Sequence, residues 1–448
     1  PDSDFVGIDL SAKAIARGED LRVRLGLDNL QLVADDLMAW QPDGRPFDFI
    51  VAHGFYSWVP APVRDCLLRL CGTWLAPAGL ACVSYNTLPG GHLRRMLWDI
   101  MRYQADGAAD PDERIARALE CVDLLESGMP EGRHYTTVMR EEIRWLRDRL
   151  DPSVLFHDDL AEINDPCFFD AFLRHARTHG LDFVAEASYH EMSPRNAAPE
   201  VRDMLAGIAV DDLATKEQYL DFFTGRRFRQ TLLGRAGAGM HGQADSQALA
   251  DLEVVSPMHL EPDAPASAEG VSFRHPTNGS LRTPDPLIQA ALAHAAARYP
   301  GACRVSTLGG IAAASASLAT PDAGEVDRLH RFLLRAFEVG LLELHLDAPV
   351  FASEPDTMPV ASPLARLMLA GQHGLIPNLR PRLVRLPDAL VGELLLLLDG
   401  TRDRAALQAL ANDGIATGRL PPPQNGDVTE VVDACIVEFA RLALIVAK

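Results

Sequence analysis

Aspartates end two apolar, strand-like segments near the start of the sequence. Asp9 lies in FVGIDLS (5–11), and Asp35 and Asp36 end QLVADD (31–36). In an open parallel sheet, a ligand binds in the crevice beyond the carboxyl ends of the strands. A carboxylate there can accept hydrogen bonds from two ribose hydroxyls, and one after the next strand can accept from the amino group of adenine. The order predicts a nucleoside site, with Asp9 in the first role, Asp35 in the second and Asp36 close behind.

Each aspartate alone is weak evidence, because aspartate is common in turns and helix caps. Ser11 precedes the helix-like AKAIARGEDLRVRL (12–25) and is suited to cap it. The order strand–acid, helix, strand–acid, strand favours a nucleoside site over ordinary turns, and we expect Leu10 and Ser11 to extend it. The sequence has no glycine-rich turn before Asp9, so the predicted site is incomplete.

An aromatic segment, HGFYSWVP (53–60), directly follows a third strand-like run. We expect His53 and Gly54 to contact the ligand because they stand at the end of that strand. His53, Tyr56 and Trp58 could also line a channel that desolvates an amine and holds a cation by cation–π contact. In the alternative interpretation, the aromatics only cap the sheet and pack beneath a helical layer.

The next segments complete a predicted sheet domain over residues 1–91. PVRDCLLRLCGTWLAP (62–77) has the pattern of an amphipathic helix, which Gly79 should break before a buried strand, LACVSYN (80–86). Tyr85 ends this strand and could line the same channel. A turn then leads into the helix-like HLRRMLWDIMRYQA. We therefore expect an α/β domain here, followed by α-helical parts.

Residues 92–235 have mainly helical spacing and few strand-like runs, so a helical layer over the carboxyl ends of the strands is expected. EQYLDFFTGRRFRQTLL (217–233) is interpreted as a helix, a turn at Gly225 and a second helix. Its predicted core residues are Phe222, Phe223, Phe228 and Leu232. Its arginines 226, 227 and 229 are expected to face solvent or to pair with acids of the sheet domain, and this docking role is favoured over binding of a free anion.

Two polar clusters in this region leave alternatives open. HARTH (175–179) places two histidines at metal-ligand spacing, but no third ligand is evident, so packing is favoured and no metal site is predicted. His157, Asp158 and Asp159 form a helix start or a polar patch facing a cleft. The acids and Tyr189 within 186–191 could accept a substrate ammonium group.

The C-terminal half is predicted to contain a linker and a helical domain. Residues 236–284 are rich in Gly, Ser, Pro and Asp and carry two short strand candidates, which indicates a docked linker. Residues 285–448 show helices followed by short strands, a pattern typical of winged-helix-like units. Their 14 basic and 18 acidic residues favour protein contacts over DNA.

Composition restricts the function classes. The chain has 448 residues and a net charge of −20, which argues against nucleic acid as the main partner. The seven cysteines are dispersed, as expected for reduced thiols in the cytoplasm. No apolar run is long enough to span a membrane. The aliphatic C-terminal helices are compatible with a homodimer.

These segments together resemble a known family. FVGIDLS, VADD, FDFIVAHGFYSWVP (47–60) and GLACVSYNTLPGGHLRRM (79–96) are similar to class I S-adenosylmethionine-dependent methyltransferases. The sequence departs from that family at its start, where a first strand and a GCGxG-type loop are expected. HDDLAEINDPCFFDAFLRHARTHGLDFVAEASYHEM (157–192) and TKEQYLDFFTGRRFRQTLL (215–233) resemble the bacterial group that carries a methyltransferase regulatory domain, which includes rickettsial protein-lysine methyltransferases.

The resemblance implies a Rossmann-like sheet without its N-terminal strand and glycine-rich loop, a helical regulatory domain and a winged-helix-like C-terminal domain. It implies S-adenosylmethionine as cofactor and a protein side chain, lysine above others, as acceptor. The catalytic candidates are then His53, Tyr56 and Tyr85. Two alternatives stay open: an enzyme that methylates a small molecule or peptide, and a non-catalytic adaptor built on a methyltransferase scaffold.

Overall fold

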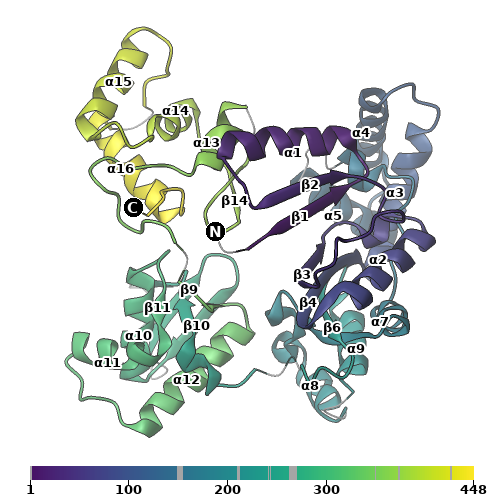
Figure 1. Cartoon of the computed structure of the whole chain (residues 1–448), viewed down its shortest axis with the longest axis horizontal. Coiled ribbons are helices and arrows are strands. Elements are labelled where there is room, and N and C mark those ends of the chain that lie inside the picture. The colour runs from purple at the N-terminus through teal and green to yellow at the C-terminus, as the bar shows by residue number, and fades with distance from the viewer. Residues whose placement is uncertain are drawn as a thin grey trace. The chain divides into compact units, whose positions relative to one another are not determined.

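The chain folds into two compact units in the computed structural model (Figure 1). One unit comprises residues 1–20 and 29–243, and the other comprises 21–28 and 244–448. Each has its own apolar cores and is described by itself. The structure describes residues 3–148, 155–208, 212–240, 242, 244–261, 270–348, 350–371, 374–423 and 426–447.

The first elements match the predicted order. Strands β1 (Phe5–Asp9) and β2 (Leu30–Ala34) pair in parallel, and helix α1 (Ala12–Leu25) connects them. In this register Asp9 lies opposite Ala34, so the two strands end side by side. This parallel pairing is what the strand–acid, helix, strand–acid order predicted.

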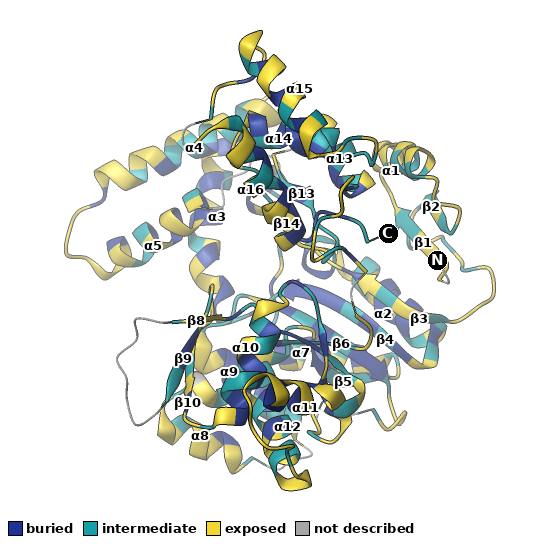
Figure 2. Cartoon of the chain, turned by 90° about the vertical axis from the view of Figure 1, so that its left-hand side faces the viewer, coloured by how far each residue is buried: buried dark blue, intermediate teal, exposed yellow. Residues whose placement is uncertain are grey.

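The main sheet has four strands in the order β3-β4-β6-β5, with β3 and β4 parallel and the other pairs antiparallel. Among the described strands, neither β1 nor β2 is hydrogen-bonded to this sheet. The single sheet predicted within residues 1–91 is therefore two separate sheets. β3 is consequently an edge strand, and Phe49 and Val51 are 72% and 69% exposed. Figure 2 shows buried residues at the centre of the main sheet, whereas the residues of β1 and β2 are intermediate or exposed. Its strands are β3 (Phe47–Ala52), β4 (Leu75–Asn86), β5 (Leu181–Glu186) and β6 (Phe228–Arg235).

The prediction of a second helix after Gly225 is wrong. Gly225 has φ +61° and ends helix α9 (Leu213–Thr224), and β6 follows it. Arg229, Thr231 and Leu233 are buried at alternate positions, which is the two-residue period of a strand. The prediction that three phenylalanines lie in the core is also wrong. Phe222, Phe223 and Phe228 are 48%, 50% and 37% exposed.

Two helices pack on the main sheet. Leu68 and Cys71 of α2 (Ala61–Trp74) share a core with Phe172 and Leu173 of α7 (Phe169–Thr178). Helix α2 is shorter than predicted, because β4 begins at Leu75 and runs through Gly79.

A helical layer supplies a second core within this unit. Buried residues such as Met101, Val122 and Ile143 hold its three helices together. The layer comprises α3 (Gly91–Ala105), α4 (Pro111–Gly128), α5 (His134–Asp148) and the π-helical turn η2 (Leu155–Asp159). Shorter elements are the 3-10 turns η1 (Tyr56–Trp58), η3 (Tyr189–Met192) and η4 (Pro194–Asn196), and helix α8 (Pro199–Ala206).

Residues 236–284 were predicted to be a linker, but their strands belong to a folded core. Strand β7 (Glu253–Val255) is the centre of a three-stranded sheet, and Val254, Val255 and Phe273 are buried. The other elements of this part are η5 (Ala248–Asp251), β8 (His259–Leu260), β9 (Val271–His275), β10 (Gly279–Thr283), α10 (Pro286–Ala297), β11 (Cys303–Arg304), α11 (Val305–Ser315), α12 (Ala323–Glu338) and β12 (Glu343–His345).

The last part of the chain has a separate core, which includes Leu395, Leu407 and Phe439. Here two helices, α14 and α15, flank a turn in which Gly400 has φ +85°. Its elements are α13 (Pro363–Ala370), β13 (Ile376–Pro377), β14 (Leu383–Val384), α14 (Ala389–Leu397), α15 (Arg404–Ala416) and α16 (Val428–Arg441).

Two further properties concern the whole chain. All seven cysteines are free thiols, as the dispersed pattern predicted. None of the described helices combines the length and apolar character needed to cross a membrane.

Candidate functional site

A pocket of about 380 Å³ opens where β3 and β4 end, within the first unit. Its walls come from the turn after β3, the end of β4, helices α3 and α5, the turn η2 and the start of β6. This position agrees with the general rule that ligands bind beyond the carboxyl ends of parallel strands. The helical layer therefore closes the pocket over the sheet, as predicted from its sequence pattern.

Indole rings dominate the pocket walls. Trp58, Trp98 and Trp145 all line it, and the chain has only five tryptophans. The rings of Trp58 and Trp98 meet edge to face, with centroids 6.4 Å apart. Of these three, the sequence pointed to Trp58 alone, because Trp98 and Trp145 lie on helices that only the tertiary fold brings to the pocket.

The charged groups of the pocket are arranged in pairs. Asp159 is buried and accepts hydrogen bonds from an Arg94 Nη and from the Trp98 indole, each 2.5 Å long. Arg227 makes a bidentate pair with Glu142 at 2.8 and 2.6 Å. Since both guanidinium groups are matched by carboxylates, the arginines do not by themselves make the pocket an anion site.

Asp158 also lines the pocket, beside Asp159. The expectation of a polar patch facing a cleft therefore describes this pair correctly. The side chain of the neighbouring His157 lies outside the described residues.

Hydrogen bonds between loops fix the turn after β3. The Gly54 N–H donates to Ser84 Oγ at 2.7 Å, and the Asn86 N–H donates to Ser57 Oγ at 2.8 Å. Both serines are completely buried. The aromatic segment is consequently bound to the end of β4 and does not form a free loop.

The predicted catalytic residues separate into two groups. His53 lines the pocket, and its ring meets Phe228 edge to face at 5.8 Å. Tyr56 is buried, with its hydroxyl 2.9 Å from His175 Nδ1. Tyr85 is also buried, stacks on a phenylalanine of α7 and has its hydroxyl 3.1 Å from Thr231 Oγ1. Of the three, only His53 lies where it can contact a ligand in the pocket.

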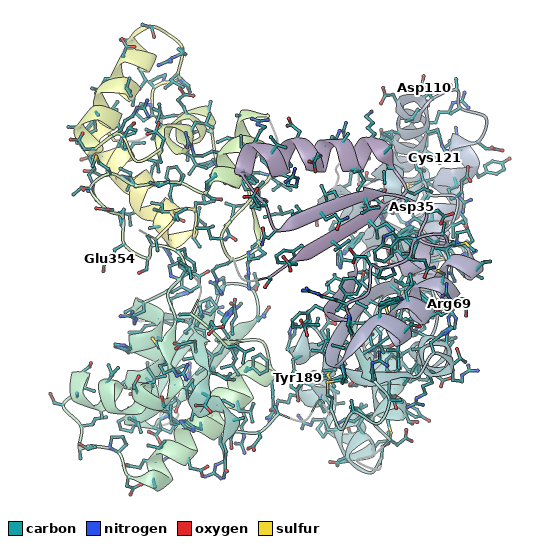
Figure 3. The ribbon with its side chains drawn as sticks, viewed as in Figure 1. Asp35, Arg69, Asp110, Cys121, Tyr189 and Glu354 are labelled. Atoms are coloured by element: carbon teal, nitrogen blue, oxygen red, sulfur yellow. The ribbon has the colours of Figure 1, made fainter. Side chains whose placement is uncertain are left out.

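The predicted nucleoside residues lie at the paired ends of β1 and β2. The Asp35 N–H donates to the Asp9 carbonyl at 3.2 Å, so these two acids adjoin each other. Asp35, labelled in Figure 3, is half-buried, whereas Asp9 and Asp36 are exposed. Leu10 is 78% exposed, and the Ser11 hydroxyl caps α1 by accepting from the Ala14 N–H.

Hydrogen bonds within local turns occupy part of the acceptor capacity of the Asp9 and Asp35 carboxylates. Asp9 accepts from the Ser11 N–H at 2.7 Å, and Asp35 accepts from the Asp36 N–H at 2.8 Å. A carboxylate has about four acceptor positions, so both retain capacity for a ligand. His53 and Gly54, the other predicted cofactor residues, belong to the pocket wall.

The arginine cluster of β6 has a structural role. Arg229 is completely buried and forms a bidentate pair with Asp221 at 2.9 and 2.8 Å and a bond to Glu186 at 2.5 Å. Glu217 accepts from the same guanidinium group at 3.3 Å. Glu186 is thereby engaged in the core and does not face the pocket. These arginines pair with acids, but the acids lie within residues 142–221 and not in the predicted sheet domain over residues 1–91, so that part of the prediction is wrong.

Burial dominates the electrostatics of Glu217. Desolvation raises the pKa of its carboxyl group to about 7, against the opposing influence of Arg229 and Arg226. Its Oε1 atom is buried and has no hydrogen-bond partner.

Known protein families match three parts of the chain. Residues 1–79 match a methyltransferase domain, residues 151–235 match a predicted methyltransferase regulatory domain, and residues 357–444 match the PKMT C-terminal winged helix domain. The resemblances stated from the sequence are thus confirmed, and the winged helix is located in the last part of the second unit.

Two curated proteins of one rickettsial species are similar in sequence to part of this chain. The uncharacterized protein RP789 of Rickettsia prowazekii (strain Madrid E) is 35% identical over 234 residues, which is 52% of this chain and 42% of RP789. RP028 of the same organism is 29% identical over 40% of this chain and 71% of its own length. The chain therefore spans less than half the length of RP789.

The fold is shared with a solved structure. PKMT2 from Rickettsia typhi, determined in complex with AdoHcy, superposes with a TM-score of 0.87 at 23% identity. The match covers 100% of this chain and 90% of PKMT2. The chain therefore matches a methyltransferase domain, a methyltransferase regulatory domain and a PKMT C-terminal winged helix domain in sequence, and it shares the fold of PKMT2.

Proposed function

We propose that this chain, with its methyltransferase and regulatory domains, transfers a methyl group from S-adenosylmethionine to the ε-amine of a lysine in a protein substrate. The observation that carries the proposal is the indole-lined pocket at the ends of β3 and β4. The domain matches support the methyl donor, and the PKMT names of the winged helix domain and of PKMT2 support a lysine acceptor.

The residues at the ends of β1 and β2 suit the donor. Asp9 is suited to accept from the ribose hydroxyls, and Asp35 and Asp36 from the adenine amino group. The adjoining ends of the two strands support this assignment, since one nucleoside can contact both acids. Leu10 and Ser11 border the same edge. When bound, the donor supplies an electrophilic methyl group on a sulfonium, so the protein needs no covalent intermediate.

The pocket suits a lysine side chain by its shape and charge. The indoles of Trp58 and Trp98 can attract an ammonium group by cation–π contact, worth about 0.5–2 kcal/mol per well-placed ring, whereas the Arg94 guanidinium group already lies over the Trp145 ring. Asp158 adds a carboxylate at the wall, and Asp159, which is paired with Arg94, holds the Trp98 ring in position. The apolar stem of a lysine can lie along the same indoles.

His53 is the residue best placed to handle the acceptor proton. A lysine attacks only as a neutral amine, and its pKa falls in a desolvated, aromatic pocket. The His53 imidazole at the pocket wall can take up the proton that the amine must lose. The loops fixed by Ser57 and Ser84 would then hold donor and acceptor in line, which lowers the entropic part of the barrier.

The proposal can be tested by following a labelled methyl group from S-adenosylmethionine into a bacterial extract. We expect label in protein, and lysine methylation in the digested product. His53→Ala should reduce turnover by about 100-fold or more, as is usual when a general base is removed. Trp58→Leu should mainly raise KM, by about 2- to 30-fold, since it removes one cation–π contact.

Matched controls separate these effects from misfolding. Trp40→Leu replaces a tryptophan outside the pocket and should leave kinetics unchanged. Asp9→Ala should weaken binding of S-adenosylhomocysteine in calorimetry, whereas Asp43→Ala, an exposed loop substitution, should not. Label found only in low-mass material would replace lysine by a small-molecule acceptor. Failure to bind S-adenosylhomocysteine would instead support the adaptor interpretation.

A further inference from the structure

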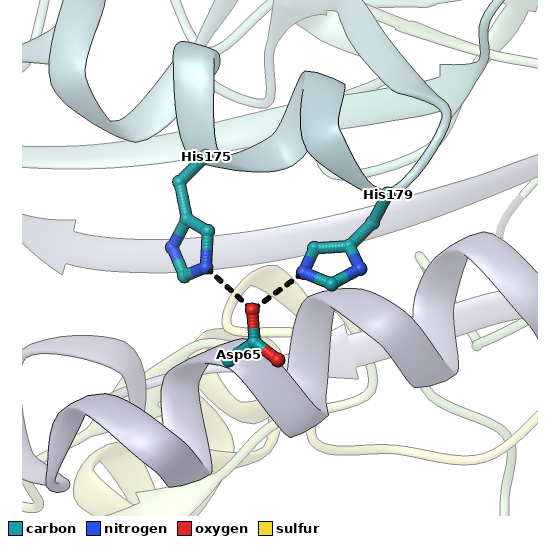
Figure 4. Close-up of side chains that lie close together, drawn as sticks. All are labelled: Asp65, His175 and His179. Carbon is teal, nitrogen blue, oxygen red and sulfur yellow. Dashed lines mark hydrogen bonds and ion pairs between the residues drawn. The ribbon is translucent and has the colours of Figure 1, made fainter.

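A second cluster of chemically reactive side chains lies where α2 and α7 pack together (Figure 4). His175 and His179 are one helical turn apart at the end of α7, so both rings point the same way. Asp65 of α2 faces them from 110 residues earlier in the chain. The sequence offered no third group beside the two histidines, and the tertiary fold supplies it.

The distances fit a shared cation. Asp65 Oδ1 lies 3.2 Å from His175 Nε2 and 2.8 Å from His179 Nε2, and all three atoms lie within 4.8 Å of one another. Around a tetrahedral zinc ion with bonds of about 2.0–2.1 Å, neighbouring ligand atoms are about 3.3 Å apart. The two distances from Asp65 lie within about half an ångström of that spacing, and the two histidine nitrogens are at most 4.8 Å apart, so rotations of these side chains can bring the set into coordination geometry.

The buried Tyr56 hydroxyl contacts the ring nitrogen of His175 that does not face Asp65. Tyr56 is 4% exposed, and its hydroxyl lies 2.9 Å from His175 Nδ1. A hydroxyl can donate or accept, so it matches either tautomer of the ring. When Nε2 binds a metal, Nδ1 carries the proton and donates it to the tyrosine oxygen, which is a usual outer contact of metal-binding histidines.

The helices that carry the ligands are held close and rigid. At Gly72 of α2, an added Cβ atom would lie 2.0 Å from the backbone oxygen of His179. The packed core beneath includes Leu68 of α2 and Phe172 of α7. Ligands on packed helices keep their geometry better than ligands on loops.

We propose that Asp65, His175 and His179 form a site for a divalent transition-metal ion, with zinc as the expected occupant. Two imidazole nitrogens and one carboxylate oxygen suit zinc, and the exposed side of Asp65 leaves a fourth position for water. The ion would join α2 to α7 and, through Tyr56, stabilise the 3-10 turn η1. Trp58 of that turn lines the pocket, so the metal would also support the pocket wall.

Zinc binding by the full chain, freed of metal by a chelator, tests the site directly. Competition against a chromophoric chelator should give one equivalent bound. His175→Ala, His179→Ala and Asp65→Asn should each weaken binding by about 100-fold or more. Tyr56→Phe should weaken it by about 10-fold, the lower end of the usual cost of losing an outer partner. The matched control is His190→Ala, an exposed histidine of the same unit, which should bind as the unchanged chain does.

A second measurement remains informative if a histidine variant folds poorly. Asp65 is 55% exposed, so Asp65→Asn should keep the fold, and zinc should raise the melting temperature of the unchanged chain but not of this variant. Equal zinc affinity in the unchanged chain and the His175→Ala/His179→Ala double variant would overturn the proposal. So would an equal rise in melting temperature in the unchanged chain and Asp65→Asn.

Discussion

The buried ion cluster around Arg229 is the strongest electrostatic feature at the scale of single residues. Two guanidinium groups, of Arg226 and Arg229, face three carboxylates, of Glu186, Glu217 and Asp221. The charges balance only if one carboxyl group is protonated. Burial raises the pKa of both Glu217 and Asp221, to about 7 for Glu217, so we expect Glu217 to be the group that takes up the proton. Buried pairs are sensitive to imbalance, since an uncompensated charge has no solvent to stabilise it.

This arrangement predicts a pH dependence of stability. The folded chain binds the Glu217 proton more tightly than the unfolded chain, so stability falls as pH rises from the ordinary value of 4.5 to about 7, and the loss is complete above that. Glu217→Gln keeps the shape without the charge. Its free energy of unfolding should equal that of the unchanged chain near pH 4.5 and exceed it by about 1–3 kcal/mol at pH 8.

Urea unfolding followed by tryptophan fluorescence can measure this difference. All five tryptophans lie within residues 40–145, so the signal reports the first unit alone. Glu141→Gln, an exposed substitution on α5, is the control and should show no such trend. A difference between Glu217→Gln and the unchanged chain that does not vary with pH would exclude Glu217 as the titrating group.

At the scale of elements, the sequence predicted most where short-range pattern decides the structure. Strand β3, the parallel pair β1–β2 and helix α1 follow from apolar runs, an acid and a cap, all local signals. Strand β6 was missed because two of its buried positions hold Arg229 and Thr231, which break the apolar alternation that identifies a strand. Those polar residues are tolerated only because distant acids satisfy them.

The candidate site was predictable in part for the same reason. His53 and Trp58 directly follow a strand, so their place at a ligand crevice could be inferred. Trp98 and Trp145 lie on amphipathic helices, where a tryptophan is ordinarily a packing residue. Asp65 has no local relation to His175. Long-range packing, which brings these residues together, leaves no trace in spacing along the chain.

A close backbone contact at Gly90 determines how the start of α3 meets the turn before β6. A Cβ atom on Gly90 would lie 2.0 Å from the Gly225 carbonyl oxygen and 2.5 Å from that of Arg226. Gly90 itself has ordinary helical angles, with φ −59° and ψ −31°, so the need for glycine is purely steric. The contact joins the start of α3 to the turn before β6, and both border the pocket.

We therefore expect Gly90→Ala to destabilise the first unit by about 1–3 kcal/mol, because backbone atoms must move apart. Methyl transfer should fall with it, since the pocket walls separate. Gly128→Ala, at the end of α4 where no atom lies within 4 Å, should change stability by less than about 1 kcal/mol and in the stabilising direction. Urea unfolding by fluorescence compares the two variants, and similar effects would show that the Gly90 contact is not decisive.

At the scale of the whole molecule, composition and division into units govern what the chain can contact. The net charge of −20, and the acidic excess over residues 285–448, predict that the winged-helix part does not bind DNA, since DNA binding needs a basic face. A protein partner for this part, and a homodimer, stay predictions from the sequence. The second unit contains two separate apolar cores, neither of which includes a residue of the first.

Because the units have separate cores, we expect two transitions in scanning calorimetry of the full chain. Only the first unit contains the proposed donor and acceptor residues. S-adenosylhomocysteine at about 100 times its Kd should stabilise that unit by about 2.7 kcal/mol and leave the other transition unmoved. Tryptophan fluorescence identifies which transition belongs to the first unit. A single transition that shifts as a whole would mean that the units unfold together, and the ligand would then be stabilising both.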